Sequence, residues 1–160
     1  MSDFEPTPVD IIYGTVTGNA QTLAEDFSER CDELGVPCRL IAAEDFALDE
    51  FSANDAHKVL IFSTWGDGEP PDDAIDFCEA LYDQKAPVSG VKYAIVALGD
   101  SAYTDFCGCG RRLDDALKAG GAVSIMDRVD LDVDFEADFE AWMDRYFALQ
   151  RGEASLAGSE

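Results

Sequence analysis

The chain has 160 residues, which is the length of one domain or of two small ones. Hydrophobic residues make up 47% of it, and this excludes a disordered or fibrous protein. Thirty-four acidic residues stand against 11 lysines and arginines, giving a net charge of −23. Because binding to a phosphate backbone needs clustered cations, this charge argues strongly against nucleic acid as a partner. It favours either basic protein partners or adaptation to a salt-rich cytoplasm.

The sequence also lacks the marks of a membrane or secreted protein. No run of 18 apolar residues is present, so no membrane span is predicted, and the first ten residues do not resemble a secretory signal. The five cysteines form no C-x-x-C pair, which favours a reducing cytoplasm over a disulfide framework or a metal site. Cys31 and Cys78 fall on apolar helix faces and are expected to be buried, and Cys107 and Cys109 are the one closely spaced pair.

Strand-like apolar runs alternate with helical periodicity along the chain. In order, the predicted elements are strand Val9–Tyr13, helix Ala20–Leu34, strand Val36–Ala42, a helical turn at Phe46–Phe51, strand Val59–Ser63, helix Ala74–Tyr82, strand Tyr93–Leu98, a helix around Leu113–Leu117, strand Ala122–Val129, and a last helix with the inner stripe Phe135, Phe139, Trp142 and Tyr146. This alternation predicts one doubly wound α/β domain over residues 1–150, with a five-stranded parallel sheet. Residues 151–160 are predicted to form a polar tail.

Ligands of such sheets bind beyond the carboxyl ends of the strands, so the loops there carry the candidate site. The first loop, Thr15–Ala20, joins a strand to a helix start, where backbone N–H groups and the helix dipole favour an anion. The loop has neither the lysine of a nucleotide kinase nor the G-x-G-x-x-G of a dinucleotide site. It therefore suits a single terminal phosphate, and an ordinary helix cap is the alternative interpretation.

Two aromatic residues follow the next two buried strands. Trp65 lies in the loop Ser63–Pro71, between a strand and two glycines, and Tyr103 lies in the loop Leu98–Phe106. Aromatic side chains on adjacent loops can hold a flat heteroaromatic ring between them by stacking. Either residue alone is consistent with simple packing at the rim, but both occur after the strands that should border the first loop.

These loops together resemble the flavodoxin family, most closely the flavodoxin-like FMN domain of diflavin reductases such as the sulfite reductase flavoprotein. The matching stretches are Tyr13–Ala20, Ser63–Asp72, Leu98–Tyr103 with Phe106–Cys107, and Arg128–Asp130. The resemblance runs from about Val9 to Leu149 and implies the strand order 2-1-3-4-5. Because the fifth strand carries no long insertion, the chain is similar to the short-chain type.

The resemblance implies FMN as the cofactor, with no catalytic residue and no metal. The phosphate would be held by Thr15, Val16, Thr17, Gly18, Asn19 and Ala20. Trp65 and Tyr103 would stack on the two faces of the flavin ring. The remaining ring contacts would be Ser63, Thr64, Gly66, Asp67, Gly68, Leu98, Gly99, Asp100, Phe106, Cys107, Gly108 and Cys109. Trp65 stands where the diflavin domains more often have tyrosine.

The resemblance further implies a one-electron carrier rather than an independent oxidoreductase. Its donor would be an NAD(P)H-dependent flavin reductase and its acceptor a basic redox protein, both binding transiently to a cytoplasmic monomer. The acids expected near the ring, which would make the reduced flavin a stronger reductant and form the docking face, are Asp67, Glu69, Asp100, Asp105, Asp130 and Asp132.

Three other functions are weighed against this carrier. A phosphorelay receiver needs an aspartate at the end of the third strand, where this chain has Phe62, Ser63 and Thr64, so it is disfavoured. A flavin-dependent quinone reductase would keep the fold but would need a nicotinamide and substrate pocket. An excised FMN module of a diflavin reductase remains open, although the polar ending favours a free-standing protein.

Overall fold

The computed structural model describes residues 7–14, 19–52, 56–63, 74–85, 88–98, 108–126, 128–132 and 135–150. Within these ranges the strands are β1 (Val9–Gly14), β2 (Cys38–Ala42), β3 (His57–Ser63), β4 (Lys92–Leu98), β5 (Val123–Ser124) and β6 (Val129–Leu131). They form one sheet of parallel pairs in the order β2-β1-β3-β4-β5, with β6 also paired to β4. The predicted fold class and strand order are confirmed.

β5 and β6 share the fifth position of the sheet. β5 pairs with the first two residues of β4, and β6 pairs with the last three. The Ile125 N–H still donates to the Tyr93 carbonyl at 2.9 Å, after which the ladder is interrupted until Val129. The single strand predicted at Ala122–Val129 is therefore two short strands, the second of which continues to Leu131.

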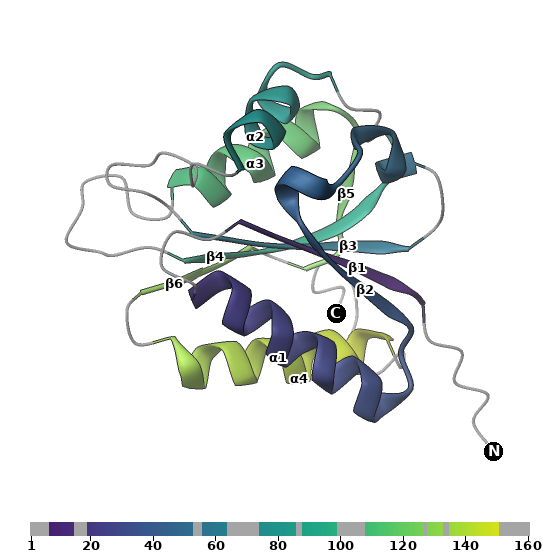
Figure 1. Ribbon diagram of the computed structural model, residues 1–160, viewed down its shortest axis with the longest axis vertical. Helices are drawn as coiled ribbons and strands as arrows, with labels where there is room; N and C mark the ends of the chain where they lie inside the picture. The colour runs from purple at the N-terminus through teal and green to yellow at the C-terminus, as the bar shows by residue number, and fades with distance from the viewer. Residues whose placement is uncertain are drawn as a thin grey trace.

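Helices cover both faces of the sheet (Figure 1). The helices α1 (Asn19–Leu34) and α4 (Glu136–Gln150) lie on one face, and α2 (Ile75–Tyr82) and α3 (Gly108–Ala119) lie on the other. The helical turn predicted near Phe46 is two 3-10 helices, η1 (Ala43–Asp45) and η2 (Leu48–Ser52). In the part of the chain that the structure describes, no helix has the length and apolar character to cross a bilayer.

The central strands are buried on both faces, as their continuous apolar runs predict. Ile11 and Val59 pack in the cluster beneath α1 and α4, whereas Ile12 and Leu60 pack in the cluster beneath α2 and α3. All four side chains are 0% exposed. Because successive strand residues point to opposite faces, two layers of helices are required to cover this sheet.

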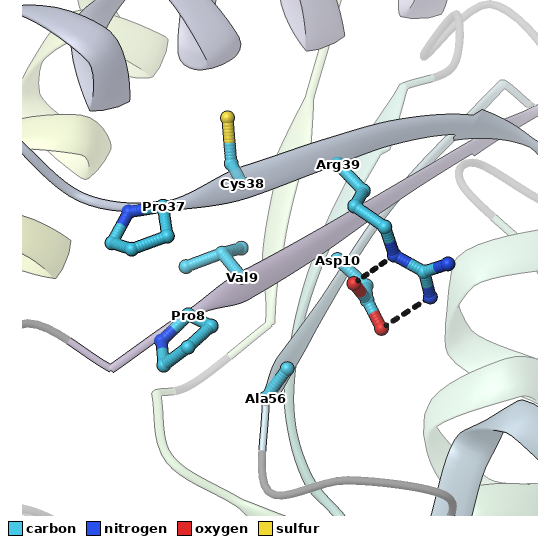
Figure 2. Close-up of a pocket in the computed structure, with 7 residues that line it drawn as sticks. All are labelled: Pro8, Val9, Asp10, Pro37, Cys38, Arg39 and Ala56. Atoms are coloured by element: carbon cyan, nitrogen blue, oxygen red, sulfur yellow. Dashed lines mark hydrogen bonds and ion pairs between the residues drawn. The ribbon is translucent and has the colours of Figure 1, made fainter.

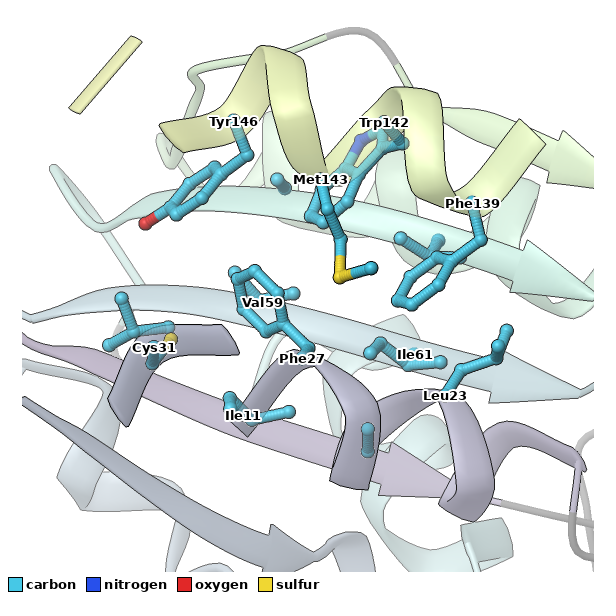
Figure 3. Close-up of a cluster of buried hydrophobic side chains, with 14 of the residues drawn as sticks. Ile11, Leu23, Phe27, Cys31, Val59, Ile61, Phe139, Trp142, Met143 and Tyr146 are labelled. Carbon is cyan, nitrogen blue, oxygen red and sulfur yellow. The ribbon is translucent and has the colours of Figure 1, made fainter. Parts of the chain in front are cut away.

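Aromatic side chains join α1 to α4 over the first cluster (Figure 3). The Phe27 ring of α1 lies 5.5 Å from the Trp142 ring and 5.4 Å from the Tyr146 ring. Trp142 stacks in turn on Tyr146 at 5.6 Å and on Phe139 at 6.0 Å. The predicted inner stripe of the last helix is thereby confirmed, with Phe135 half-buried at its start.

The turn that ends α1 sets where β2 begins. Gly35 has a φ of +76°, a left-handed conformation that glycine adopts without steric cost. It lets the Val36 N–H donate to the Cys31 carbonyl at 2.8 Å, which closes the helix in a Schellman motif. β2 therefore starts at Cys38, two residues later than predicted, because Val36 caps the helix and Pro37 has no N–H for a ladder.

Candidate functional site

The predicted site lies along one edge of the sheet, formed by the carboxyl ends of β1, β3 and β4. In the parallel register Gly14 lies opposite Phe62, and Ser63 lies opposite Leu98. α1, α2 and α3 each begin after one of these strands, so their amino termini return to the same edge, at the left of Figure 1. The sheet thus brings together the ends of the three loops singled out from the sequence.

Six of the predicted site residues belong to the described ranges. Asn19 and Ala20 open α1, Gly108 and Cys109 open α3, and Ser63 and Leu98 close β3 and β4. The other predicted residues lie outside the described residues: Thr15, Val16, Thr17, Gly18, Thr64, Trp65, Gly66, Asp67, Gly68, Gly99, Asp100, Tyr103, Phe106 and Cys107. Their roles remain predictions, and the described strand and helix ends give the frame that holds them.

Gly14 brings the end of β1 into close contact with β3 and with the start of α2. A Cβ atom at this position would lie 2.8 Å from Cε2 of Phe62 and 2.9 Å from Cβ of Ala74. Both neighbours are fully buried and have no room to move. The first loop therefore leaves the sheet from a point where only glycine fits, a constraint that the sequence did not reveal.

Gly110 likewise brings the start of α3 into close contact with β4. A Cβ atom at Gly110 would clash with Cβ of Ala97, so the helix start rests directly on the strand. Leu98, the last residue of β4, is buried beside this contact. The two ends of the third loop are consequently fixed by a glycine–alanine pair, Gly110 and Ala97, that sequence patterns did not single out.

Replacing Gly110 by alanine is therefore expected to destabilise the protein by about 1–3 kcal/mol, because the added methyl group overpacks the contact with Ala97. The higher helix propensity of alanine offsets about 1 kcal/mol at most. Urea unfolding measures the change. The matched control is Gly110→Ala combined with Ala97→Gly, which moves the methyl group from strand to helix and should recover most of the loss; no recovery would contradict the contact.

The start of α1 suits an anion electrostatically. Its first turn contains no acidic residue, as is also true of α3, whereas the first turn of α2 contains Asp76 and that of α4 contains Glu136 and Asp138. The N–H groups that begin a helix have no partner within the helix itself, and together with the positive end of the dipole they attract negative charge. Ala20, in that first turn, is 0% exposed and packs in the cluster beneath α1 and α4. This arrangement fits a bound phosphate group.

Comparisons with known proteins agree with this frame. The family model of flavodoxin matches residues 11–142. The chain belongs to the flavodoxin family. The sulfite reductase [NADPH] flavoprotein alpha-component of Photobacterium profundum is 39% identical over 148 residues, which are 92% of this chain and 24% of that protein. The counterpart from Bacillus subtilis is 34% identical over 137 residues, 85% of this chain and 22% of that protein.

Solved flavodoxin structures share the fold over their whole length. A flavodoxin from Streptococcus pneumonia TIGR4 superposes with a TM-score of 0.77 at 25% identity, covering 91% of this chain and 98% of that one. A mutant flavodoxin from Pseudomonas aeruginosa gives 0.76 at 28% identity, covering 91% and 99%. By contrast, the chain spans about a quarter of the length of the sulfite reductase flavoproteins. The resemblance to both groups, predicted from the loops, is confirmed.

In this flavodoxin-family chain an ion-pair network fastens β6 to β4 and α3. The Arg128 guanidinium donates to Asp130 at 2.8 Å and to Asp114 at 3.3 Å. Asp114 also accepts a 2.6 Å hydrogen bond from the Tyr93 hydroxyl. The hydrogen bond to Asp130 raises the pKa of Arg128, and burial opposes it only in part. Asp130, one of the acids predicted to lie near the ring, is therefore paired with Arg128.

Besides the ion pairs of Arg128, a second polar cluster lies at the amino ends of β1 and β2, away from the carboxyl ends that border the predicted site. There a cavity of about 320 Å³ is lined by Pro8, Val9, Asp10, Pro37, Cys38, Arg39 and Ala56 (Figure 2). Asp10 accepts hydrogen bonds from Arg39 at 2.9 Å and from Lys58 at 2.9 Å. Burial favours a higher pKa for Asp10, but these two cations outweigh it and hold the pKa below its ordinary value.

Proposed function

We propose that this chain binds FMN at the carboxyl edge of the sheet and carries single electrons between redox proteins. The observation that supports it most is the register of the sheet, which aligns the ends of β1, β3 and β4 where the three flavodoxin-like loops begin. The flavin supplies the redox chemistry, and the protein binds it, orients it and controls its surroundings.

In this proposal the start of α1 binds the phosphate. Backbone N–H groups of residues 16–20 and the hydroxyl groups of Thr15 and Thr17 donate hydrogen bonds to the phosphate oxygens. No lysine or arginine lies in this loop, so the helix dipole and the backbone carry the binding. A single phosphate monoester satisfies these donors, which favours FMN over FAD, whose second nucleotide half has no counterpart loop.

Trp65 and Tyr103 then orient the flavin ring and exclude water from its two faces. Replacing either residue by alanine is expected to weaken FMN binding about ten- to a hundredfold, since it removes buried aromatic area worth about 1–3 kcal/mol. Fluorescence titration of the apoproteins with FMN measures the affinity. The controls are Trp65→Phe and Tyr103→Phe, which keep an aromatic ring and should bind within about threefold of the wild type.

The cofactor itself is tested by reconstitution. Apoprotein is titrated with FMN, FAD and riboflavin, and the cofactor of freshly purified protein is released by heat and identified by chromatography. We expect FMN to be recovered and to bind best, and riboflavin to lose the affinity that the phosphate supplies. Recovery of FAD, or equal affinity for riboflavin, would contradict the proposed phosphate site.

The acidic surface is proposed to dock basic partners around the flavin. Neutralising Asp67, Glu69 and Asp105 to their amides should flatten the dependence of electron-transfer rate on salt, because exposed charges are screened within about 8–10 Å at physiological ionic strength. Stopped-flow reduction of a basic c-type cytochrome, used as the probe acceptor, measures this rate.

The matched control for this prediction neutralises three exposed acids of α1, namely Glu25, Asp26 and Glu29. Asp114 of α3 is unsuitable for this control because it is 5% exposed and accepts a hydrogen bond from Tyr93. A docking face predicts a flatter salt dependence in the first set only. Equal slopes in both sets would instead assign the acidity to general adaptation to salt.

The coverage of the sulfite reductase flavoproteins, about a quarter of their length, supports a second candidate function. The chain would then be the FMN module of a larger reductase, receiving electrons from a flavin domain of the same protein. Immunoblotting of the native protein in its source cells distinguishes the two. A band at 17.4 kDa, the mass of this chain, supports a separate carrier, and a much larger band supports the module.

A further inference from the structure

Two thiols from different elements meet between the last turns of α1 and the start of β2. Cys31 of α1 is 0% exposed, and Cys38, the first residue of β2, is half-buried. Both pack in the cluster beneath α1 and α4. The Schellman turn after α1 reverses the chain between them, since the Val36 N–H is bonded back to the Cys31 carbonyl. The thiols are therefore brought together by the fold as well as by their closeness in sequence.

The contacts of Cys38 place its sulfur against α1. Cys38 Sγ lies 3.5 Å from Oγ of Ser28 and 3.9 Å from the Ser28 carbonyl oxygen. Ser28 precedes Cys31 by three residues, so both lie on the same face of the helix. Figure 2 shows the Cys38 side chain on the opposite side of β2 from Arg39. Burial raises the pKa of the Cys31 thiol, and the neighbouring Cys38 raises it further.

We propose that Cys31 and Cys38 form a reversible internal disulfide. They are a thiol–disulfide exchange site remote from the carboxyl ends of β1, β3 and β4, where FMN is proposed to bind. The oxidant is a low-molecular-weight disulfide. The two thiols of the other close pair, Cys107 and Cys109, take no part in it. The proposal stands independently of flavin binding, since all of its contacts lie at the amino end of β2 and the carboxyl end of α1.

The exchange proceeds in two steps. Cys38, the more exposed thiol, attacks one sulfur of the small disulfide, whose S–S bond breaks; one thiol leaves with the Cys38 proton, and Cys38 carries the other half as a mixed disulfide. Cys31 then attacks the Cys38 sulfur, and the second small thiol leaves with the Cys31 proton. Two protein thiols thus lose two electrons and two protons, which the small disulfide gains. Because Cys31 is 0% exposed and out of reach of a small disulfide, whereas Cys38 is half-buried, Cys38 initiates the exchange and Cys31 resolves the mixed disulfide.

The chain is well suited to testing this pair by mass spectrometry. Trypsin cleaves after Arg30 and Arg39, so Cys31 and Cys38 lie on one peptide of residues 31–39, separate from the peptides that hold the other cysteines. The folded protein as purified is incubated with glutathione disulfide, then unfolded in urea and alkylated with iodoacetamide without reduction, and digested. We expect the 31–39 peptide to carry no alkyl group and to be two hydrogen atoms lighter. A doubly alkylated peptide, or one that stops at a glutathione adduct, would overturn the proposal.

Single variants assign the order of attack. Cys31→Ser should trap glutathione on Cys38, whereas Cys38→Ser should leave Cys31 unmodified in the folded protein. Cys78→Ser, which alters another buried thiol, is the matched control and should form the internal disulfide like the wild type. Glutathione on Cys31 in Cys38→Ser would overturn the assigned order.

A stability measurement covers the case in which the buried variant Cys31→Ser fails to fold. Oxidised wild-type protein should unfold about 5 °C higher than reduced protein, since the disulfide restricts the unfolded chain and joins α1 to β2. Dithiothreitol should reverse the rise, and Cys38→Ser, altered at a half-buried position, should show none. An unchanged midpoint on oxidation would overturn the proposed link between α1 and β2.

Discussion

Replacing Asp10 by alanine is expected to cost about 3–5 kcal/mol of stability, because it removes the carboxylate from a buried charge cluster. Asp10 is 3% exposed and lies 2.9 Å from the Nζ atom of Lys58, which is 0% exposed. Arg39 bonds the same carboxylate at 2.9 Å and reaches Glu50 at 2.8 Å. Without Asp10, the Lys58 ammonium stays in the core without the carboxylate that holds its charge.

The cost arises because the buried Lys58 ammonium loses the carboxylate 2.9 Å away, and a double variant separates that cause from simple loss of packing. Asp10→Ala combined with Lys58→Met removes both charges and should recover most of the lost stability. Arg39→Ala should cost much less, because the Arg39 side chain is 50% exposed and water can replace its contacts. Urea unfolding of the three proteins measures these differences. A cost below about 1 kcal/mol for Asp10→Ala would contradict a buried cluster that depends on this carboxylate.

The sequence pattern predicted the sheet well because its central strands are apolar on both faces. The runs at Val9–Tyr13 and Val59–Ser63 are almost entirely apolar, and helices cover both of their faces. Asp10 and Lys58 lie within or next to these runs on neighbouring strands. The carboxylate of Asp10 bonds Lys58 and Arg39 of β2, and no local sequence pattern records contacts between strands.

The break in the fifth strand was hidden from the sequence for the same reason. Val123, Ile125 and Val129 favour a strand over Ala122–Val129, yet in the described residues the ladder runs to Ile125 and resumes at Val129. Where β6 begins, Arg128 pairs with Asp114 of α3 and with Asp130 of β6. The contact with Asp114 joins residues far apart in the sequence, so no local pattern predicts it. The alignment of the strand ends that border the candidate site could be predicted from the sequence because the strand-end rule needs only the order of elements. The close contacts at Gly14 and Gly110 could be recognised only from the structure, because the residues that they touch lie on other elements.

Acidification from pH 7 to pH 4.5 is expected to remove about 2–3 kcal/mol of stability through a single buried residue, His57. Its ring is 8% exposed, and Nδ1 lies 2.8 Å from the hydroxyl oxygen of Tyr146. That hydroxyl accepts a 3.0 Å hydrogen bond from Gln150, whose amide also holds the Thr7 backbone at 2.8 Å and 2.9 Å. His57 thus belongs to a polar chain that joins the start of β1 to the end of α4.

Burial, together with the positive charges of the nearby Lys92 and Lys58, lowers the pKa of His57 to about 4. The unfolded chain takes up a proton near its ordinary pKa of about 6.5, while the folded chain stays neutral until about pH 4. Between these values the unfolded state binds more protons, so the stabilising contribution is fully present above pH 6.5 and is lost as the pH falls. Protonation of the many carboxylates changes stability in the same range, so the effect must be isolated by comparison.

The comparison uses His57→Gln, which keeps a hydrogen-bonding group toward Tyr146 but cannot titrate. The difference in unfolding free energy between wild type and variant should shift by about 2–3 kcal/mol in favour of the variant between pH 7 and pH 4.5, since the carboxylates contribute equally to both proteins. Tyr146→Phe is the matched control: it breaks the same polar chain but leaves His57 able to titrate, so its stability should fall with pH as the wild type does. Parallel pH profiles for wild type and His57→Gln would show that the histidine is solvated enough to be protonated in the folded protein. They would then exclude it as the source of acid sensitivity in this fold.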